Sequence, residues 1–255
     1  MLNLSGQLIH REVSARYRGS ALGTLWALLT PLFMLAIYTF LFGTVLQVRW
    51  GAQQNSTADF AIILFSGLIV FHFFSEVVTR APTLILSNVN FVKKVVFPIE
   101  ILPVVALGTA LFHMALSLLV LLAFFVVLHG TIQTTVLLLP FAIAPLALLL
   151  LGLSWFLAAL GVYMRDINQI IGPVMTALMF VSPIFVPATS LPERVRAFVF
   201  LNPVAIPVEA LREVVIFGHA PNWIALAIYT VVATLIAILG YLFFQKTRKG
   251  FADVL

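Results

Sequence analysis

Long apolar runs constrain this sequence more than any other feature. Several exceed about eighteen residues, the length at which an apolar stretch is read as a membrane-spanning helix. The chain has 255 residues, of which 62% are hydrophobic and 9% charged. Lipid offers backbone groups no hydrogen-bond partner, so each span should be an α-helix. The sequence predicts an all-α polytopic membrane protein with six transmembrane helices, at roughly 22–46, 60–79, 99–128, 134–160, 168–187 and 222–244.

The positions of lysine and arginine set the predicted orientation. Six spans place both termini on one side, and the side richer in basic residues faces the cytoplasm. Of the 14 basic residues, ten fall on the side of the termini and four on the other. The ten are Arg11, Arg16, Arg18, Arg80, Lys93, Lys94, Arg165, Lys246, Arg248 and Lys249; the four are Arg49, Arg194, Arg196 and Arg212. Both termini are therefore predicted to be cytoplasmic. No folded basic face is visible, so the basic balance does not indicate a nucleic-acid partner.

Residues 1–20 precede the first span and have their own pattern. Ile9, Val13 and Tyr17 fall on one helical stripe together with Leu2, and Arg11 lies on the opposite side with Arg18. This pattern is typical of an amphipathic helix that lies in the membrane interface. A generic membrane anchor is the alternative interpretation.

The stretch "SNVNFVKKVVFPIE", residues 87–100, separates two apolar runs and resembles neither of them. Its serine and asparagines favour caps and turns. Phe91 and Phe97 stand beside Lys93 and Lys94, and large apolar residues on a water-facing loop often mark a partner site. The stretch is interpreted either as a docking site for another protein or as an ordinary positive-inside loop.

Residues 188–218 are apolar enough to enter a membrane, but polar residues interrupt them. A charged side chain at the centre of a spanning helix costs about 2.5–3.5 kcal/mol on insertion scales. The sequence therefore favours a re-entrant helix–break–helix that enters from outside and serves as an outer gate, over a seventh and an eighth short span. Its charges are expected to pair near water. The interrupting residues are Asn202, Pro203, Glu209, Arg212 and Glu213.

Four ionisable residues are predicted to lie at membrane depth. His72, Glu76 and Arg80 follow an i, i+4, i+8 spacing, so they share one face of the second span and can pair. His113 is expected to be alone in the third span. Such residues are functional candidates by default, although a Glu76–Arg80 pair one turn from water can equally be structural. No carboxylate-rich relay runs through the spans, which argues against proton or sodium coupling.

Several kinds of catalytic chemistry have no sequence signal. The chain contains no G-x-x-x-x-G-K-[ST] phosphate-binding loop, which predicts that it does not hydrolyse ATP itself. It has no cysteine, no histidine–carboxylate cluster with metal-ligand spacing, and no apparent nucleophile–base pair. The sequence predicts neither an enzyme nor a metal site.

Four stretches together resemble a known family. They are "REVSARYRGSALGTLWALLTPLFMLAIYTFLFG" (11–43), "SNVNFVKKVVFPIEILP" (87–103), "RDI" (165–167) and "FVSPIFVPATSLPERVRAFVFLNPVAIPVEALRE" (180–213). They resemble the ABC-2 type permeases that export O-antigen, capsule and teichoic-acid polysaccharides. The resemblance implies a homodimer of permeases with two ATPase subunits, which bind the ATP and magnesium. The complex would move a lipid-linked polysaccharide outward across the inner membrane, and this chain would hold no cofactor.

The resemblance also assigns roles within the chain. Residues 1–20 would be a cytoplasmic interface helix, and 21–255 the ABC-2 transmembrane domain, with a coupling helix at about 87–98 and outer gate helices at about 191–217. The coupling helix would use Asn88, Asn90, Phe91, Lys93, Lys94 and Phe97; the interface helix Arg11, Arg16, Tyr17 and Arg18; the gate Asn202, Pro203, Glu209, Arg212 and Glu213. Because sugars lie on aromatic faces, the candidates for the substrate path are Phe33, Tyr38, Phe71, Phe73 and Phe74.

Other functions remain open at the level of sequence. An ABC-2 exporter of drugs or small lipids would share the architecture. A channel or secondary carrier would work without an ATPase. A membrane-embedded transferase would need paired polar catalytic groups near one membrane face.

Overall fold

The computed structural model describes residues 2–41, 57–93, 97–185 and 201–255, and every regular element in these ranges is helical. An all-α protein was predicted, and it is confirmed for this part of the chain. The longer helices are α1 (Leu2–Tyr17), α2 (Trp26–Tyr38), α3 (Thr57–Arg80), α5 (Ile101–His129), α6 (Leu139–Tyr163), α7 (Ile167–Val181) and α10 (Trp223–Thr247). The shorter ones are α4 (Val89–Lys93), α9 (Ala205–Arg212) and α11 (Phe251–Val254), and a π-helical turn, Glu213–Phe217, continues α9.

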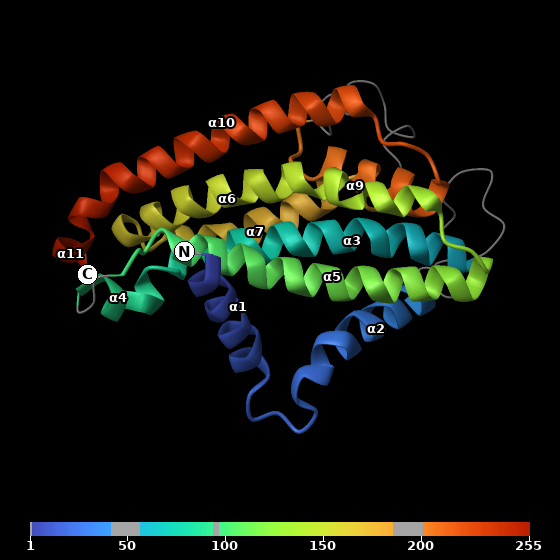
Figure 1. The fold of residues 1–255 in the computed structure, drawn as a ribbon, viewed down its shortest axis with the longest axis horizontal. Helices are drawn as coiled ribbons and strands as arrows, with labels where there is room; N and C mark the ends of the chain where they lie inside the picture. The colour runs from blue at the N-terminus through green and yellow to red at the C-terminus, as the bar shows by residue number, and fades with distance from the viewer. Residues whose placement is uncertain (1, 42–56, 94–96, 186–200) are drawn as a thin grey trace.

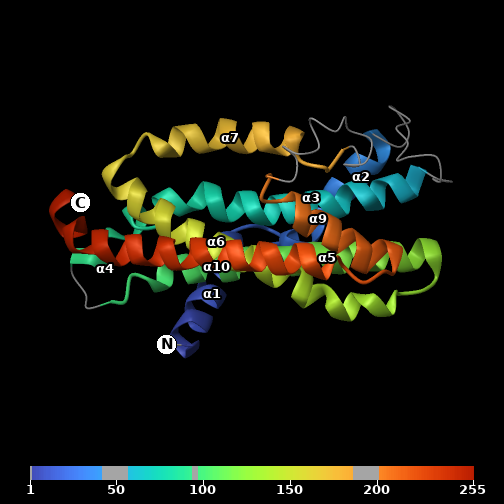
Figure 2. The same ribbon diagram turned by 90° about the horizontal axis from the view of Figure 1, so that it is seen from above.

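The long helices form an elongated bundle with α3 at its centre (Figures 1 and 2). Helix α3 contacts α2, α5, α6, α7 and α9, and α10 packs along α6. Helices α10 and α2 lie on opposite sides of the bundle in Figure 1. Helix α4 and both chain ends lie toward one end, which we call the α4 end.

Five described helical segments are long and apolar enough to cross a membrane, which supports a multi-pass membrane protein. They are Gly23–Leu41, Ala58–Thr83, Ile101–His129, Thr134–Tyr163 and Trp223–Val254. Helix α7, the predicted fifth span, is apolar but has only 15 residues, fewer than the about 20 needed to cross the bilayer.

Helix α7 is short because it ends two residues before a proline. Ser182 is extended, with φ −76° and ψ 148°, the conformation that the ring of Pro183 imposes on its predecessor. The predicted span at 168–187 is therefore not one continuous helix, since its helix ends at Val181. Residues 186–187, the end of that predicted span, lie outside the described residues.

Small residues let α6 and α10 approach closely. A Cβ atom added at Gly152 of α6 would lie 2.6 Å from the Cα atom of Ala237 in α10. Gly240 of α10 in turn faces the backbone of Gly152. Such contacts stabilise helix pairs in lipid, where association depends on close packing rather than on the hydrophobic effect.

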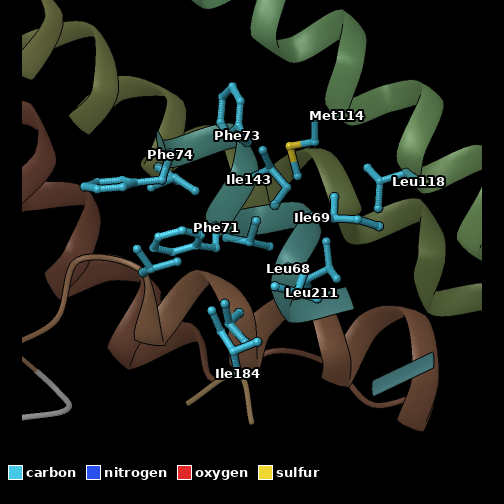
Figure 3. Packing of buried hydrophobic residues seen from close by; sticks show 14 of the residues in the cluster. Leu68, Ile69, Phe71, Phe73, Phe74, Met114, Leu118, Ile143, Ile184 and Leu211 are labelled. Carbon is cyan, nitrogen blue, oxygen red and sulfur yellow. The ribbon is translucent and has the colours of Figure 1, made fainter. Parts of the chain in front are cut away.

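The main core surrounds α3. Phe71, Phe73 and Phe74 are only 4%, 2% and 3% exposed, and Figure 3 shows them among side chains of the neighbouring elements, including Met114 and Ile184. Their burial stabilises the bundle through close van der Waals packing, which drives the association of helices in lipid. These three rings were predicted to line a substrate path. That prediction is wrong for the single chain, since packing covers them.

A second, smaller apolar cluster lies at the α4 end, and we call it the α4-end cluster. Its buried members are Leu84, Ile85, Ile99, Leu102, Ala106, Ala158, Ala159, Val162, Phe244 and Phe251.

Candidate functional site

A tight turn connects α1 to α2. Gly19 and Gly23 have φ values of +88° and +54°, a left-handed conformation that side chains disfavour and glycine adopts freely. The two helices diverge from this turn like the arms of a V (Figure 1).

The predicted apolar stripe of α1 faces the bundle. Val13 is buried, and Ile9 and Tyr17 are half-buried, whereas Arg11 and Arg18 are exposed. Helix α1 packs on α5, where Gly108 leaves the space that the Ile9 side chain occupies. Membrane-interface placement of α1 stays a prediction.

Six polar residues join α1 to α3 and α5, and we call them the α1–bundle polar cluster. Nη1 of Arg16 lies 2.5 Å from Oε1 of Glu76, and that carboxylate lies 2.9 Å from Nδ1 of His113. Oη of Tyr17 lies 3.3 Å from Nε2 of the same histidine. Arg80 forms an ion pair with Glu12. The members are Glu12, Arg16, Tyr17, Glu76, Arg80 and His113.

This cluster corrects two predictions. His113 is not alone in its span, and Arg80 pairs with Glu12 of α1 rather than with Glu76. Burial raises the pKa of the Tyr17 phenol, so Tyr17 keeps its proton and can donate it toward Nε2 of His113. Nδ1 of His113 lies 3.2 Å from Nη1 of Arg16 and 2.9 Å from Oε1 of Glu76. Both ion pairs therefore hold the end of α1 against the bundle.

A cavity of about 510 Å³ lies beside the polar cluster, between α1, α3 and α5. Its lining includes Thr79, Thr109 and the charged groups of both ion pairs. Because two arginines face two glutamates, the lining has no net charge. The lining therefore does not favour an ion of one sign.

The stretch before α4 forms turns, as its composition predicted. The Ser87 hydroxyl donates to the carbonyl of Thr83 at 2.8 Å, and Nδ2 of Asn88 donates to that of Leu84 at 2.9 Å. Asn90 is exposed on α4. Lys94 and the side chain of Lys93 lie outside what the structure describes.

The aromatic rings of the predicted docking stretch pack against the bundle. Phe91 and Phe97 stack with ring centroids 4.5 Å apart, and both are half-buried against the α4-end cluster. Both rings are therefore partly covered by the bundle, and their role in docking stays a prediction. The stacked rings hold the stretch against the bundle.

Arg212 is the most deeply buried charged residue of the described chain, with 4% of its surface exposed. Its guanidinium donates to the carbonyls of Ile63 at 3.2 Å, Pro183 at 2.6 Å and Ile184 at 3.1 Å. These carbonyls belong to α3 and to the chain that follows α7. Arg212 therefore ties α9 to both.

Neighbouring residues accommodate the Arg212 side chain and attach the segment before α9 to the bundle. A Cβ atom at Gly67 would lie 2.7 Å from Nη2 of Arg212, so the glycine makes room for the guanidinium. Nδ2 of Asn202 donates to Oγ of Ser182 at 2.8 Å, and the Tyr229 hydroxyl donates to the carbonyl of Pro203 at 2.7 Å.

The charges of this region do not form the expected water-exposed pairing. Arg212 is buried, so the prediction that it sits near water is wrong. Glu213 instead contacts His219, with 3.0 Å between Oε2 and Nδ1, and Glu209 is half-buried. The first half of the predicted gate, about 191–200, lies outside the described residues.

Two candidates for the substrate path remain on α2. Phe33 is 55% exposed, and Tyr38 is half-buried against the main core. Their accessibility permits contact with a ligand or a second chain, but it is equally expected of lipid-facing side chains.

Known proteins resemble the chain along nearly its whole length. The O-antigen export system permease protein RfbA of Myxococcus xanthus is 27% identical over 248 residues, covering 96% of this chain and 93% of that protein. RfbA of Klebsiella pneumoniae is 23% identical, with coverage of 97% and 93%. The polysialic acid transport protein KpsM of Escherichia coli is 27% identical, with coverage of 95% and 92%. The sequence profile of the ABC-2 type transporter family matches residues 4–216. The chain therefore belongs to the ABC-2 type transporter family.

Proposed function

We propose that this chain is the permease subunit of an ABC exporter that moves a lipid-linked polysaccharide outward across the inner membrane. The polymer would be of the O-antigen, capsule or teichoic-acid type. The similarity to permeases named for O-antigen export and polysialic acid transport carries this proposal, since it covers more than nine-tenths of both chains. Hydrolysis of ATP falls to a separate ATPase subunit that binds the nucleotide and magnesium.

The working assembly is two permeases and two ATPases. Helix α2 supports a permease homodimer, because only 11% of the most apolar stretch of its span is buried within the chain, against 83% for α3. Its exposed apolar side chains are available to a second copy. They include Leu28, Leu32, Phe33 and Ile37.

The α4 end faces the cytoplasm in this proposal. The distribution of basic residues favours that side for both termini, and both chain ends lie toward the α4 end in Figure 1. Residues 87–98 would then be the coupling helix that docks on the ATPase. Asn90 and the two lysines would face the ATPase, and Phe91 and Phe97 would anchor the segment from within.

Helix α1 is proposed as the interface helix. Its exposed Arg11 and Arg18 would meet lipid head groups or the ATPase, while Arg16 and Tyr17 connect it to α3 and α5. Movement transmitted by the ATPase would reach the bundle through the α1–bundle polar cluster, because that cluster supplies the ion pairs between α1 and α3.

Helix α9 and the π-helical turn that continues it are proposed as the second half of the predicted outer gate, the half that follows residue 200. Arg212 fixes this element to α3, and Asn202 and Pro203 fix its start to the end of α7 and to α10. These contacts would keep α9 attached to the bundle as the fixed part of the gate.

Reconstitution with a candidate ATPase tests the proposal. The purified complex should hydrolyse ATP faster in the presence of a lipid-linked polysaccharide than in the presence of the lipid carrier alone. Stimulation by drugs or by small lipids only would instead indicate another kind of ABC-2 exporter. Failure of the permease to bind any ATPase would contradict the proposal.

A further inference from the structure

The end of the chain folds back beside the proposed coupling helix. Helix α10 ends at Thr247, a turn follows at Arg248–Gly250, and α11 begins at Phe251. Helix α11 contacts both α4 and α6, and Figure 1 shows it at the α4 end. A segment far from α4 in sequence thus becomes its neighbour.

Phe251 is the centre of this contact, and none of its surface is exposed. Its ring meets Phe244 edge-on at a centroid distance of 5.5 Å and lies 6.0 Å from the ring of Tyr163. Phe251 belongs to the α4-end cluster, against which Phe91 and Phe97 pack. Helix α11 is therefore part of the apolar support of Phe91 and Phe97. These two residues belong to the proposed coupling helix at 87–98, which we call the coupling segment.

Polar contacts attach the end of α10 to α6 and to the residue before α5. Nη1 of Arg248 lies 2.9 Å from Oε2 of Glu100, the residue before α5. Nε1 of Trp155 donates to the carbonyl of the same Glu100 at 3.1 Å. The Tyr163 hydroxyl donates to the carbonyl of Thr247 at 2.8 Å. Glu100 lies two residues after the proposed coupling helix at 87–98, so the contacts that fix Glu100 also limit where that helix can lie.

The α4-end cluster is distinct from the main core around α3. A residue of the main core contributes to the stability of the whole bundle, whereas Phe251 packs under the coupling segment. A binding surface that is held in its bound conformation loses less entropy on association. Loss of this support should therefore weaken binding of a partner even where the bundle stays folded.

We propose that residues 248–255 position the coupling segment for the ATPase, with Phe251 and Arg248 as positioning residues. The proposal rests on the proposed function, because it assigns a role in ATPase docking to a part of the chain that need not touch the ATPase itself.

The first test compares Phe251→Ala with two controls. Val254→Ala changes an exposed residue of the same short helix, and Phe65→Ala removes an equally buried ring from the main core. The dissociation constant of the detergent-solubilised permease and its ATPase is measured for each variant, together with the melting temperature of the permease.

We expect Phe251→Ala to raise the dissociation constant roughly tenfold. Val254→Ala should leave it unchanged. Phe65→Ala should lower the melting temperature without comparable loss of ATPase affinity. Equal affinity of the Phe251→Ala and wild-type permeases, or an equal loss in Phe65→Ala, would overturn the inference.

A charge exchange tests the same inference without removing a core side chain. Arg248→Glu should weaken ATPase binding through repulsion from Glu100, and adding Glu100→Arg should restore it. A double variant as weak as the single one would overturn the role of the pair. If the wild-type permease binds no ATPase at all, the proposed function fails; if wild type binds and every variant binds equally well, only this inference fails.

Discussion

Replacing Arg212 by alanine should destabilise the whole permease rather than change its gating alone. The substitution removes the donor to the buried carbonyls of Pro183 and Ile184. The third carbonyl, that of Ile63, keeps the Ser66 hydroxyl as a donor. A buried polar group left without a partner costs about 1–3 kcal/mol, so the two together cost about 2–6 kcal/mol. A chain of this size loses roughly 2–4 °C of melting temperature per kcal/mol. We therefore expect a decrease of at least about 4 °C and a lower level of the protein in membranes.

A glycine substitution tests the same connection from the other side. Gly67→Ala places a Cβ atom 2.7 Å from Nη2 of Arg212, which must displace the guanidinium although its charge remains. We expect a smaller decrease in melting temperature in the same direction. Gly172→Ala in α7 is the matched control, because a Cβ atom there meets nothing within 4 Å.

Fluorescence-detected thermal unfolding of the detergent-solubilised permease measures these changes, with membrane levels from immunoblots. Arg212→Ala protein with wild-type melting temperature and membrane level, but with altered export, would refute the reasoning. That outcome is what an arginine paired near water predicts, and it would favour a role in gating alone.

Three further predictions concern other parts of the chain. Arg16→Glu should reduce export by repelling Glu76, and the double variant with Glu76→Arg should recover part of it; no recovery in a surface-polymer assay would contradict direct pairing. Gly240→Leu should lower the melting temperature more than Arg16→Glu does, because its side chain meets the α6 backbone; unchanged thermal unfolding would contradict the close α6–α10 packing. Single cysteines at Ala220 and Asn90 should label with a membrane-impermeant maleimide from outside and from the cytoplasm respectively, and the opposite labelling would contradict the orientation.

Local sequence signals predicted much of the fold. Apolar runs placed the long helices, since the cost of exposing the backbone to lipid leaves helix as the available structure. Glycine at positions 19 and 23 suits the turn after α1, because both residues have positive φ values that glycine adopts freely. Ser87 and Asn88 predicted the turns before α4 through their short hydrogen-bonding side chains.

Contacts between distant segments could not be predicted in the same way. Glu12 and Arg80 are 68 positions apart, and nothing local indicates that α1 brings them together. The partners of Arg212 are backbone carbonyls, which every residue carries, so no residue type marks them. The burial of Phe71 follows from the central position of α3, whereas its sequence context suits a lipid-facing ring equally well.

Polymer translocation into inverted membrane vesicles tests the central claim most directly. Vesicles that contain the permease and its ATPase receive a radiolabelled lipid-linked polysaccharide on their exposed cytoplasmic face. A glycan hydrolase added afterwards digests whatever polymer stays outside. We predict that polymer enters the vesicles and becomes resistant to the hydrolase. This should require ATP, both subunits, and an ATPase that is able to hydrolyse ATP. Resistance that is the same without ATP or without the permease, or none under any condition, would contradict the assignment of this chain as a polysaccharide export permease.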